Sequence, residues 1–386
     1  MFTPLLPLEL AGEIINCLNS KDAVSFAKTN KQMMHDACRS DFGYHVKQPV
    51  AIHVIFNAKK GYTKRPYVIG YFKSFKVQNM CELLLLCEST KKITFDNLFN
   101  QKIDYQLKRF KQLTHLTFGR QFEQPVDSLE LPNTLLYLEF GHYFDQPVSK
   151  LKLPHSLTHL VFGRWFNKPV HELNSKSLTH LVFGENFEHP IFLEKNNDKF
   201  PSLTNLTVQP CLDHSVDNLD LHFCTSLKHL KFNGYIGLWF YVIVDKIKLP
   251  DSLTHLEFGH WFNQPVDKLR LPNSLTHLTF GFKFNQLVDN LTLPNSLIAL
   301  TFGNHFSQPV DRFKLPNSLK YIDFGSSFNE SVDNLKLPDS LIELKFGILF
   351  TQPIDNLVLP PSLKRIDFGL CFNKSVDKLK QPLLDL

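Results

Sequence analysis

The stretch that decides the fold is Leu253-Thr-His-Leu-Glu-Phe-Gly-His-Trp-Phe-Asn-Gln-Pro-Val-Asp-Lys-Leu-Arg-Leu-Pro-Asn-Ser274, because the same 22-residue phrase begins again at Leu275. Each copy contains a Phe-Gly pair, and most copies follow one another at 22 residues. The marked positions are Phe118, Phe140, Phe162, Phe183, Phe258, Phe280, Phe302, Phe324, Phe346 and Phe368. A fixed period of this size predicts a solenoid, in which each coil buries its apolar face only by stacking on its neighbours.

Three weaker copies complete the series. Two lie in the long gap between Phe183 and Phe258, centred on Val208 and Phe232, and a first copy runs over 93–104. We therefore expect thirteen coils over residues 93–380. Because stacked strands lie about 4.8 Å apart, they predict a rod or arc on the order of 60 Å long.

The path of one coil can be predicted from its apolar spacing. Leu256 and Phe258 alternate with polar residues, which predicts a short strand with both side chains facing the core. Gly259 follows, where a side chain would obstruct a sharp bend. Leu269-Arg-Leu271 alternates again and suggests a second short strand, and Pro272-Asn-Ser274 turns the chain into the next coil.

The phrase Leu-x-x-Leu-x-Phe is the strand signature of leucine-rich repeats. With Phe262-Asn-Gln-Pro-Val266 after it, the unit resembles the FNIP repeat, a 22-residue relative of the leucine-rich repeat. The resemblance covers about three quarters of the chain. It implies a mainly β, leucine-rich-repeat-like solenoid of 22-residue coils, with a small α-helical segment in front.

That segment is predicted to form three short helices within residues 3–45. Leu10, Ile14 and Leu18 make an apolar stripe on the first helix, and helices over 23–29 and 31–38 follow. Helices this short cannot bury a large core alone, so a partner or the following domain must complete them. The order Leu6, Pro7, Glu9, Leu10, Ile14, Leu18, Asp22, Ala23, Phe26, Ala27, Thr29, Asn30, Lys31 resembles an F-box.

An F-box-like segment followed by FNIP repeats resembles the family of F-box and FNIP repeat-containing proteins. The resemblance implies a non-enzymatic substrate-receptor subunit of a Skp–cullin–F-box ubiquitin ligase. The family is known mainly from amoebae and the large viruses that infect them, so a viral chain would use the host ligase. Residues implied to contact the Skp-type adaptor are Leu6, Pro7, Leu8, Leu10, Ile14, Ile15 and Leu18.

The sequence departs from the usual F-box at Ala23, where Leu is common, and at Asn30, where Cys is common. A Trp usual after the Lys31 position is also absent. These departures bear on the affinity for the adaptor. Residues 46–92 are expected to serve as a linker and as the N-terminal cap of the first coil.

The repeat face is where a target protein is expected to bind, because positions that vary between rigid copies usually hold a solenoid's specificity. The variable outward positions carry many histidines and aromatic residues. Candidate target-binding residues are His115, Tyr137, His159, His180, His229, His255, His277, Tyr321, Trp165 and Trp261. An inert repeat surface is the alternative. Metal binding is not expected, since neither Cys nor a carboxylate completes a ligand set beside the histidines.

Two polar rows and one interruption allow further interpretations. The Asp after Pro-Val, as at Asp267, predicts turn hydrogen bonds rather than a calcium site, which needs several oxygens per ion. The Asn after Phe, as at Asn263, predicts a similar ladder. Residues 185–250 break the rhythm, and Tyr235 and Trp239 in an inserted loop form either a binding hot spot or a harmless insertion.

Composition narrows the classes of partner. The chain is 43% hydrophobic and 20% charged, with a net charge of +5 that gives no strong case for nucleic acid. Seven scattered cysteines predict reduced thiols in the cytoplasm or nucleus, and neither a signal peptide nor an apolar run long enough for a membrane is found. Expected partners are the adaptor, a cullin and an unknown protein target, with no cofactor and a monomer outside that complex.

Two rival functions remain open at this stage. One is a protein-interaction scaffold with no link to ubiquitin ligation. The other is a hydrolase with paired carboxylates, for which Asp323 and Asp367 stand two coils apart with Lys345 between them.

Overall fold

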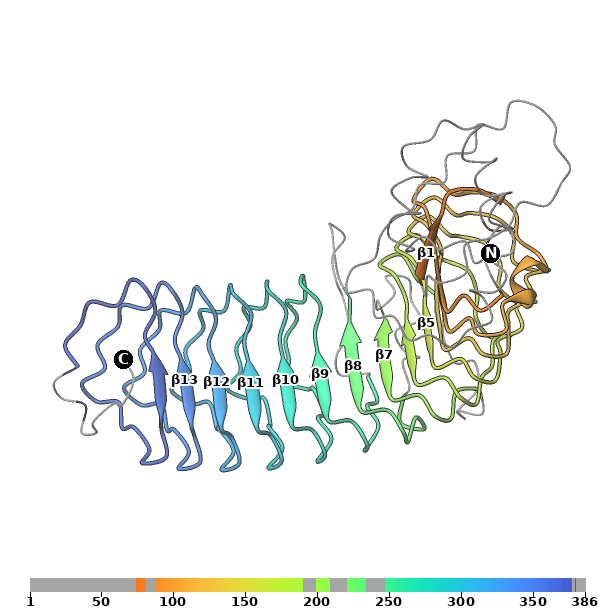
Figure 1. Cartoon of the computed structure of the whole chain (residues 1–386). Coiled ribbons are helices and arrows are strands. Elements are labelled where there is room, and N and C mark those ends of the chain that lie inside the picture. Colours follow the sequence, from red (N-terminus) through yellow and green to blue (C-terminus); the bar gives the residue numbers. More distant parts are fainter. Residues whose placement is uncertain are drawn as a thin grey trace, which may run out of the picture.

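The computed structural model describes residues 74–80, 83, 86, 88–189, 199–208, 221–233, 247–376 and 379. Within them, fourteen short strands form one parallel sheet in chain order, as the predicted solenoid requires (Figure 1). The strands are β1 (Ser74–Val77), β2 (Lys92–Phe95), β3 (His115–Thr117), β4 (Tyr137–Glu139), β5 (His159–Val161), β6 (His180–Val182), β7 (Asn205–Val208), β8 (His229–Phe232), β9 (His255–Glu257), β10 (His277–Thr279), β11 (Ala299–Thr301), β12 (Tyr321–Asp323), β13 (Glu343–Lys345) and β14 (Arg365–Asp367). A single turn of 3-10 helix, η1, spans Gln106–Arg109. β1 adds one strand ahead of the first recognisable repeat.

Each strand buries its central residue and turns its neighbours outward. In β9, Leu256 is buried while His255 and Glu257 are half-buried on the opposite face. The register repeats without slippage, so His255 lies beside His277 and Leu256 beside Leu278. Equivalent residues of successive coils therefore form continuous columns across the sheet.

Two columns of phenylalanine rings fill the interior. One column contains the Phe of each Phe-Gly pair, such as Phe280, and the other contains the Phe four residues later, such as Phe284. Within this coil the two rings stack at 4.1 Å between centroids, and Phe280 stacks on Phe302 at 5.6 Å. Both rings are at most 3% exposed. Burial of an aromatic ring is a large apolar contribution, so each coil is held mainly by its two neighbours.

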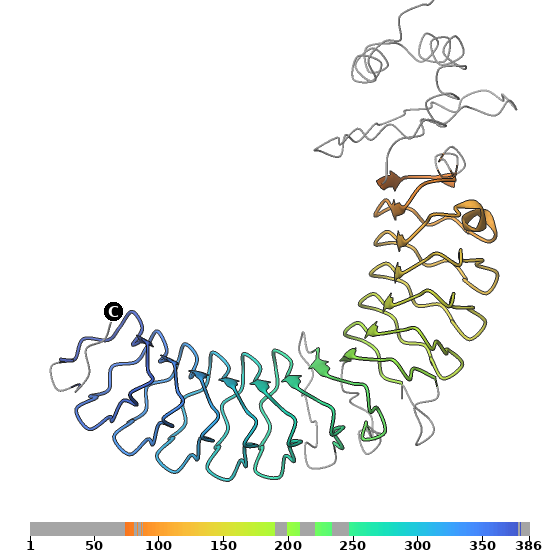
Figure 2. The same cartoon turned by 60° about the horizontal axis from the view of Figure 1, so that its bottom comes forward.

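The spacing between coils widens from the sheet toward the opposite side. The rings of His255 and His277, on the solvent-facing side of the sheet, stack at 4.1 Å between centroids. The rings of Phe258 and Phe280, on the core side of the sheet, are 5.5 Å apart. The deeper pair Phe284 and Phe306 is 6.0 Å apart. Because stacked strands are about 4.8 Å apart, this gradient bends the solenoid with its sheet on the concave side (Figure 2).

The glycine of each coil is required by the neighbouring coil. A Cβ at Gly281 would lie 1.7 Å from the carbonyl oxygen of Gly259, and one at Gly303 would lie 1.7 Å from that of Gly281. The obstacle is therefore the backbone of the preceding coil, whereas the sequence suggested an obstruction within the bend itself. Glycine lets the coils approach closely at this corner.

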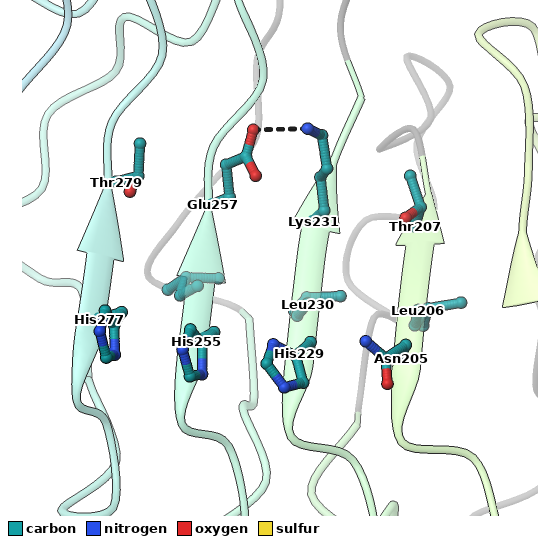
Figure 3. Close-up of a pocket in the computed structure, with 11 residues that line it drawn as sticks. Asn205, Leu206, Thr207, His229, Leu230, Lys231, His255, Glu257, His277 and Thr279 are labelled. Atoms are coloured by element: carbon teal, nitrogen blue, oxygen red, sulfur yellow. Dashed lines mark ion pairs between the residues drawn. The ribbon is translucent and has the colours of Figure 1, made fainter. Parts of the chain in front are cut away.

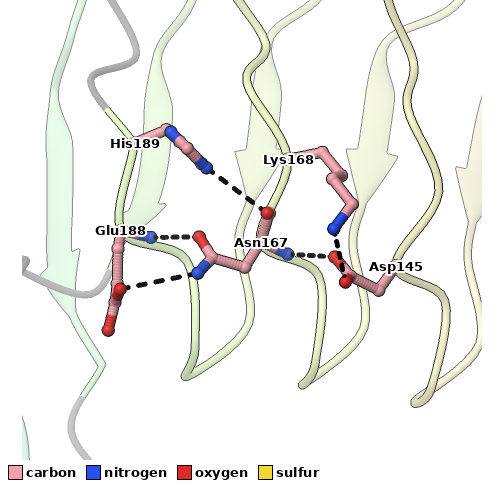
Figure 4. Close-up of polar contacts among 5 residues, drawn as sticks. All are labelled: Asp145, Asn167, Lys168, Glu188 and His189. Carbon is pink, nitrogen blue, oxygen red and sulfur yellow. Dashed lines mark hydrogen bonds and ion pairs between the residues drawn. The ribbon is translucent and has the colours of Figure 1, made fainter.

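The polar residue after the second Phe of the coil forms a ladder of hydrogen bonds between coils, as the sequence predicted. The side-chain oxygen of Asn263 accepts the backbone N–H of Asn285 at 2.8 Å, and Asn285 does the same for Ser307 at 2.9 Å. In another coil Asp145 takes the same role toward Asn167 (Figure 4). Each such residue satisfies a backbone donor that the loop leaves without a strand partner.

Two local predictions differ from the structure. Leu269-Arg-Leu271 does not form a second strand, because the backbone N–H of Leu269 turns back to the carbonyl of Val266 at 3.0 Å. At two positions of the Asp row the contacts also differ from the predicted turn bonds. Asp104 accepts a hydrogen bond from the Ser128 hydroxyl, and Asp127 accepts one from Lys150 at 3.3 Å, so these two contacts are with side chains of the next coil.

Several predicted features lie outside the described residues. They include the F-box-like segment 3–45, most of the predicted cap 46–92, and the inserted loop with Tyr235 and Trp239. Among the residues that are described, no helix has the length and apolar character needed to cross a membrane. Of the described cysteines, Cys224 lies in the core and Cys371 on the surface, and neither is in a disulfide bond.

Candidate functional site on the concave face

The concave face of the sheet carries two rows of outward side chains. The first row is the residue before the buried strand Leu or Ile, and the second is the residue after it. Along β3 to β14 most of these side chains are half-buried, and only Lys231 and the residues of β14 are more exposed. Eight of the ten predicted target-binding residues lie in the first row: His115, Tyr137, His159, His180, His229, His255, His277 and Tyr321.

The histidines of the first row form two stacked groups separated by Asn205. His159 stacks on His180 at 4.0 Å, and Tyr137 continues that group at 5.9 Å from His159. In the second group His229, His255 and His277 follow one another at 4.2 and 4.1 Å. The spacing follows from the in-register strands and the concave curvature, which bring equivalent side chains together.

A threonine before most of these histidines holds the ring in place. The Thr254 hydroxyl oxygen lies 2.9 Å from Nδ1 of His255 and 3.1 Å from the carbonyl oxygen of Lys228 in the preceding coil. The same pair of contacts occurs at Thr114, Thr158, Thr179 and Thr276. The hydroxyl therefore links each ring to the adjacent coil and restricts its rotation.

Burial favours the neutral form of five of these histidines near pH 7. Desolvation, together with the nearby His277 and His229, lowers the pKa of His255 to about 4. Desolvation also lowers the pKa of four more rings, His115, His159, His180 and His277. Tyr137 is neutral as well, since burial and its hydrogen bond to Glu139 at 2.9 Å raise its pKa to about 12.

The stacked geometry does not suit a metal ion. A metal must lie in the plane of each imidazole that binds it. His159 and His180 are within 12° of parallel and 4.0 Å apart, so their in-plane lone pairs run side by side and do not converge. Among the described residues, no group of three His, Cys, Asp or Glu side chains could hold a metal ion.

A shallow hollow of about 260 Å³ lies on this face across β7 to β10 (Figure 3). It is lined by residues of these four strands, and its polar lining includes His229, His255 and His277. Lys231 and Glu257 form an ion pair of 2.7 Å at one side, which the figure marks with a dashed line. The hollow is therefore polar, with its local charges compensated.

The C-terminal end of the concave face is charged and paired within itself. Glu343 contacts Lys345 at 3.2 Å and Arg365 at 3.5 Å, and Lys345 also lies over the Tyr321 ring at 5.3 Å. Lys345 stands between Asp323 and Asp367 in the strand register, as the sequence indicated. A cation between the two carboxylates does not favour the paired-acid arrangement of a glycoside hydrolase.

The two predicted tryptophans lie at the rim of the solenoid, two residues after the glycine of the Phe-Gly pair. Trp165 is 49% exposed and Trp261 is 41% exposed. Lys283 lies 5.3 Å from the Trp261 ring centre, and Phe282 stacks on His260 at 4.6 Å. Sequence analysis did not select Phe282 and Lys283, although they occupy the same two positions after glycine as His260 and Trp261.

The predicted adaptor-binding residues, Leu6, Pro7, Leu8, Leu10, Ile14, Ile15 and Leu18, lie outside the described part of the chain.

Comparison with known proteins identifies the repeats. The FNIP Repeat family matches residues 111–143, 245–283, 284–327 and 328–371. No curated protein sequence matches the chain significantly.

Solved structures share the solenoid fold. CroV588, described as a novel circular LRR protein, is 35% identical over 79% of this chain and 50% of its own, with a TM-score of 0.51. This chain thus spans half the length of CroV588. An internalin, inlF, from Listeria monocytogenes is 14% identical over 78% of this chain and 86% of its own, with a TM-score of 0.43. The structure of a TLR13–ssRNA13 complex is 14% identical over 77% of this chain and 47% of its own, with a TM-score of 0.48.

The FNIP repeat matches and the likeness to CroV588 agree with the periodicity and the sheet. The chain carries FNIP repeats that build a leucine-rich-repeat-type solenoid, a repeat scaffold suited to protein interaction.

Proposed function

We propose that this protein is the substrate-receptor subunit of a Skp–cullin–F-box ubiquitin ligase. Its N-terminal segment binds the Skp-type adaptor, and its concave face binds the target protein. The observation that carries the proposal is the F-box-like order of Leu6, Pro7 and Glu9 through Lys31 at the head of a chain of FNIP repeats. Such a chain acts in the cytoplasm or nucleus, where this class of ligase works.

The target would be captured without any chemistry by this chain. A receptor that holds a target and a ligase on one rigid body raises the effective concentration of each for the other. The stacked coils supply that rigidity, because their interior columns are almost fully buried. Tyr137 and Tyr321 on the face, with Trp165 and Trp261 at the rim, are of the types that dominate protein interfaces.

A pull-down of the full-length protein against a purified Skp-type adaptor and cullin tests the proposal. We expect wild type to retain both proteins, and the double variant Leu6→Ala/Pro7→Ala to lose both. Trp261→Ala is the matched control, since it changes the rim far along the chain and should leave adaptor binding intact. Equal retention by the wild type and the double variant would contradict an F-box role for this segment.

Absence of adaptor with every variant would also contradict the proposal. The protein would then be a repeat scaffold without a link to ubiquitin ligation, and its concave face would remain the candidate interaction surface.

A further inference from the structure

The positions of the threonine hydroxyls fix where each histidine carries its proton. Thr254 Oγ1 lies 3.1 Å from a carbonyl oxygen, and a carbonyl has no proton to share. The hydroxyl is placed to donate to this carbonyl, which also accepts the backbone N–H groups of Thr254 and His255. With its proton directed there, the threonine oxygen contacts His255 Nδ1, 2.9 Å away, by accepting its N–H. The neutral ring is thus protonated at Nδ1, and Nε2 keeps its lone pair.

The same assignment holds along both groups of histidines. The threonine-to-carbonyl distance is 3.0 or 3.1 Å, and the threonine-to-Nδ1 distance is 2.8 or 2.9 Å, in the four other pairs. Five half-buried rings on the concave face therefore present a hydrogen-bond acceptor and no donor beyond Nδ1. They are His115, His159, His180, His255 and His277.

The formal charges on this face also favour positively charged groups of a partner. The outward rows of β3 to β14 contain more carboxylates than cations, although the whole chain has a net charge of +5. The carboxylates are Glu139, Glu257, Asp323, Glu343 and Asp367, and the cations are Lys231, Lys345 and Arg365. The three cations all contact a carboxylate of the same face. Over β3 to β10 the excess is one carboxylate, since Glu139 and Glu257 face the single cation Lys231, and this excess disfavours nucleic acid and acidic peptides.

We propose that the concave face from β3 to β10 binds a protein segment rich in Arg and Lys side chains. Arg and Lys side chains carry only donors, which complements a row of acceptors. A guanidinium is also planar and packs on aromatic faces, which the stacked imidazoles and Tyr137 provide. The inference rests on the proposed function, in which this face takes the target, and it names the chemistry of that target.

The length of the face sets the length of the segment. Seven strand steps separate β3 from β10, which at about 4.8 Å per step is about 34 Å. An extended chain advances about 3.4 Å per residue, so about ten residues cover the face.

Acid should weaken this binding. A proton on Nε2 turns an acceptor into a charged donor, which repels Arg and Lys. The other charged or titratable groups facing the second histidine group are Lys231, Glu257 and His229. Those facing the first group are Tyr137, Glu139 and, beside His115, Lys92.

Fluorescence anisotropy with two labelled peptide pools tests the proposal on the full-length protein. Both pools are about ten residues long, one with Arg and Lys at alternate positions and one with Glu and Asp there. We expect the basic pool to bind and the acidic pool not to bind at about pH 7, with weaker binding of the basic pool at about pH 4, where His255 gains its proton. Preference for the acidic pool, or binding that strengthens in acid, would overturn the proposal.

Two double variants locate the effect. His255→Lys/His277→Lys replaces acceptors by cations and should weaken the basic pool about tenfold or more. His255→Gln/His277→Gln keeps an acceptor oxygen on each side chain and should retain most of the affinity. Equal affinity for wild type and the Lys variant would contradict the proposal, provided that circular dichroism shows both to be folded.

The adaptor pull-down separates this inference from the function on which it rests. Neither double variant touches the N-terminal segment, so both should retain the adaptor. Adaptor binding without any preference for the basic pool would refute the inference and leave the receptor function standing. Binding of the basic pool without adaptor binding would refute the receptor function and leave the inference about the concave face standing.

Discussion

The interior and the concave face of the same coils obey different rules. Behind the sheet, the ring of Phe280 or Phe284 recurs in nearly every coil, because each ring must stack on a copy of itself. In front of the sheet, equivalent positions carry His277, Ala299 and Tyr321 in three successive coils. The comparison teaches that recurrence in this sequence reports packing, and that departures from recurrence mark the surface available to a partner.

The concave face itself divides in two. Its C-terminal part satisfies its own charges, since Glu343 contacts both Lys345 and Arg365. Its middle part presents neutral acceptors held by threonine. The middle part therefore has hydrogen-bond acceptors available to a partner. In the C-terminal part, much of the hydrogen-bonding capacity is used in ion pairs within the face.

The largest effect should come from breaking an interior column. Phe284→Ala removes a fully buried ring that stacks on Phe262 and Phe306 in the adjacent coils. We expect a loss of about 3–5 kcal/mol in the free energy of unfolding. Urea denaturation followed by circular dichroism measures it. Trp261→Ala at the rim should cost far less, and equal losses for the two variants would contradict the division between interior and surface.

The close approach of the coils at glycine gives the next effect. Gly281→Ala places a Cβ 1.7 Å from the Gly259 carbonyl oxygen, so the two coils must move apart. We expect a loss of about 1–3 kcal/mol, typical of overpacking. Ser326→Ala, on the half-buried rim beside another glycine, is the control and should change stability by less than about 0.5 kcal/mol. A neutral Gly281→Ala variant would show that the close approach of the two coils does not require glycine here.

The amide ladder should contribute less than the interior. Asn263→Ala removes the acceptor of the Asn285 backbone N–H and of the Gln286 side chain. We expect a loss of about 0.5–1.5 kcal/mol in denaturant unfolding. Asn263→Asp should retain most of the stability, because Asp145 fills the same position in another coil. A larger loss for Asp than for Ala would show that the side chain does not act as an acceptor.

Stability should also fall in acid through the concave histidines. Five of them, His115, His159, His180, His255 and His277, have folded pKa values below 6.5, to about 4 for His255, so the unfolded chain binds more protons in that range. The free energy of unfolding should therefore decrease as pH falls from about 6.5 to about 4 and stop changing on this account below that. His255→Gln/His277→Gln should flatten the curve. An unchanged slope in the variant would assign the acid sensitivity to other groups.

The smallest effect is expected at the self-paired end of the face. Glu343→Gln removes a carboxylate that two partly exposed cations share. Exposed ion pairs contribute about 0–1 kcal/mol, and added salt should reduce the difference between variant and wild type. A loss as large as that of Phe284→Ala would show that this end of the face is part of the structural frame.

Much of the fold could be predicted because it depends on spacing. The alternation around Leu256 defines the strand, and the period places His255 beside His277. The curvature could not be predicted, since it arises from the difference between 4.1 Å at the histidines and 6.0 Å at Phe284 and Phe306. The failed second strand depended on a turn bond of Leu269 that apolar spacing does not reveal.

The candidate site was predicted as a row of residues and not as a set of chemical groups. The positions of His159 and His180 follow from the repeat, but their protonation depends on hydroxyl distances to a neighbouring coil. The rim residues Phe282 and Lys283 occupy the same variable pair of positions after glycine as His260 and Trp261, and only their contacts across coils distinguish them. Contacts between coils, such as Lys283 over Trp261, need the register in three dimensions.

Long-range proton–nitrogen NMR of protein labelled at its histidine nitrogens tests the central claim most directly. At neutral pH we predict that His115, His159, His180, His255 and His277 are neutral and protonated at Nδ1, and that Thr254→Val mixes the two tautomers at His255 while Thr279→Val does not. Protonation at Nε2 in the wild type would mean that the face presents donors, and the inferred basic partner would be wrong.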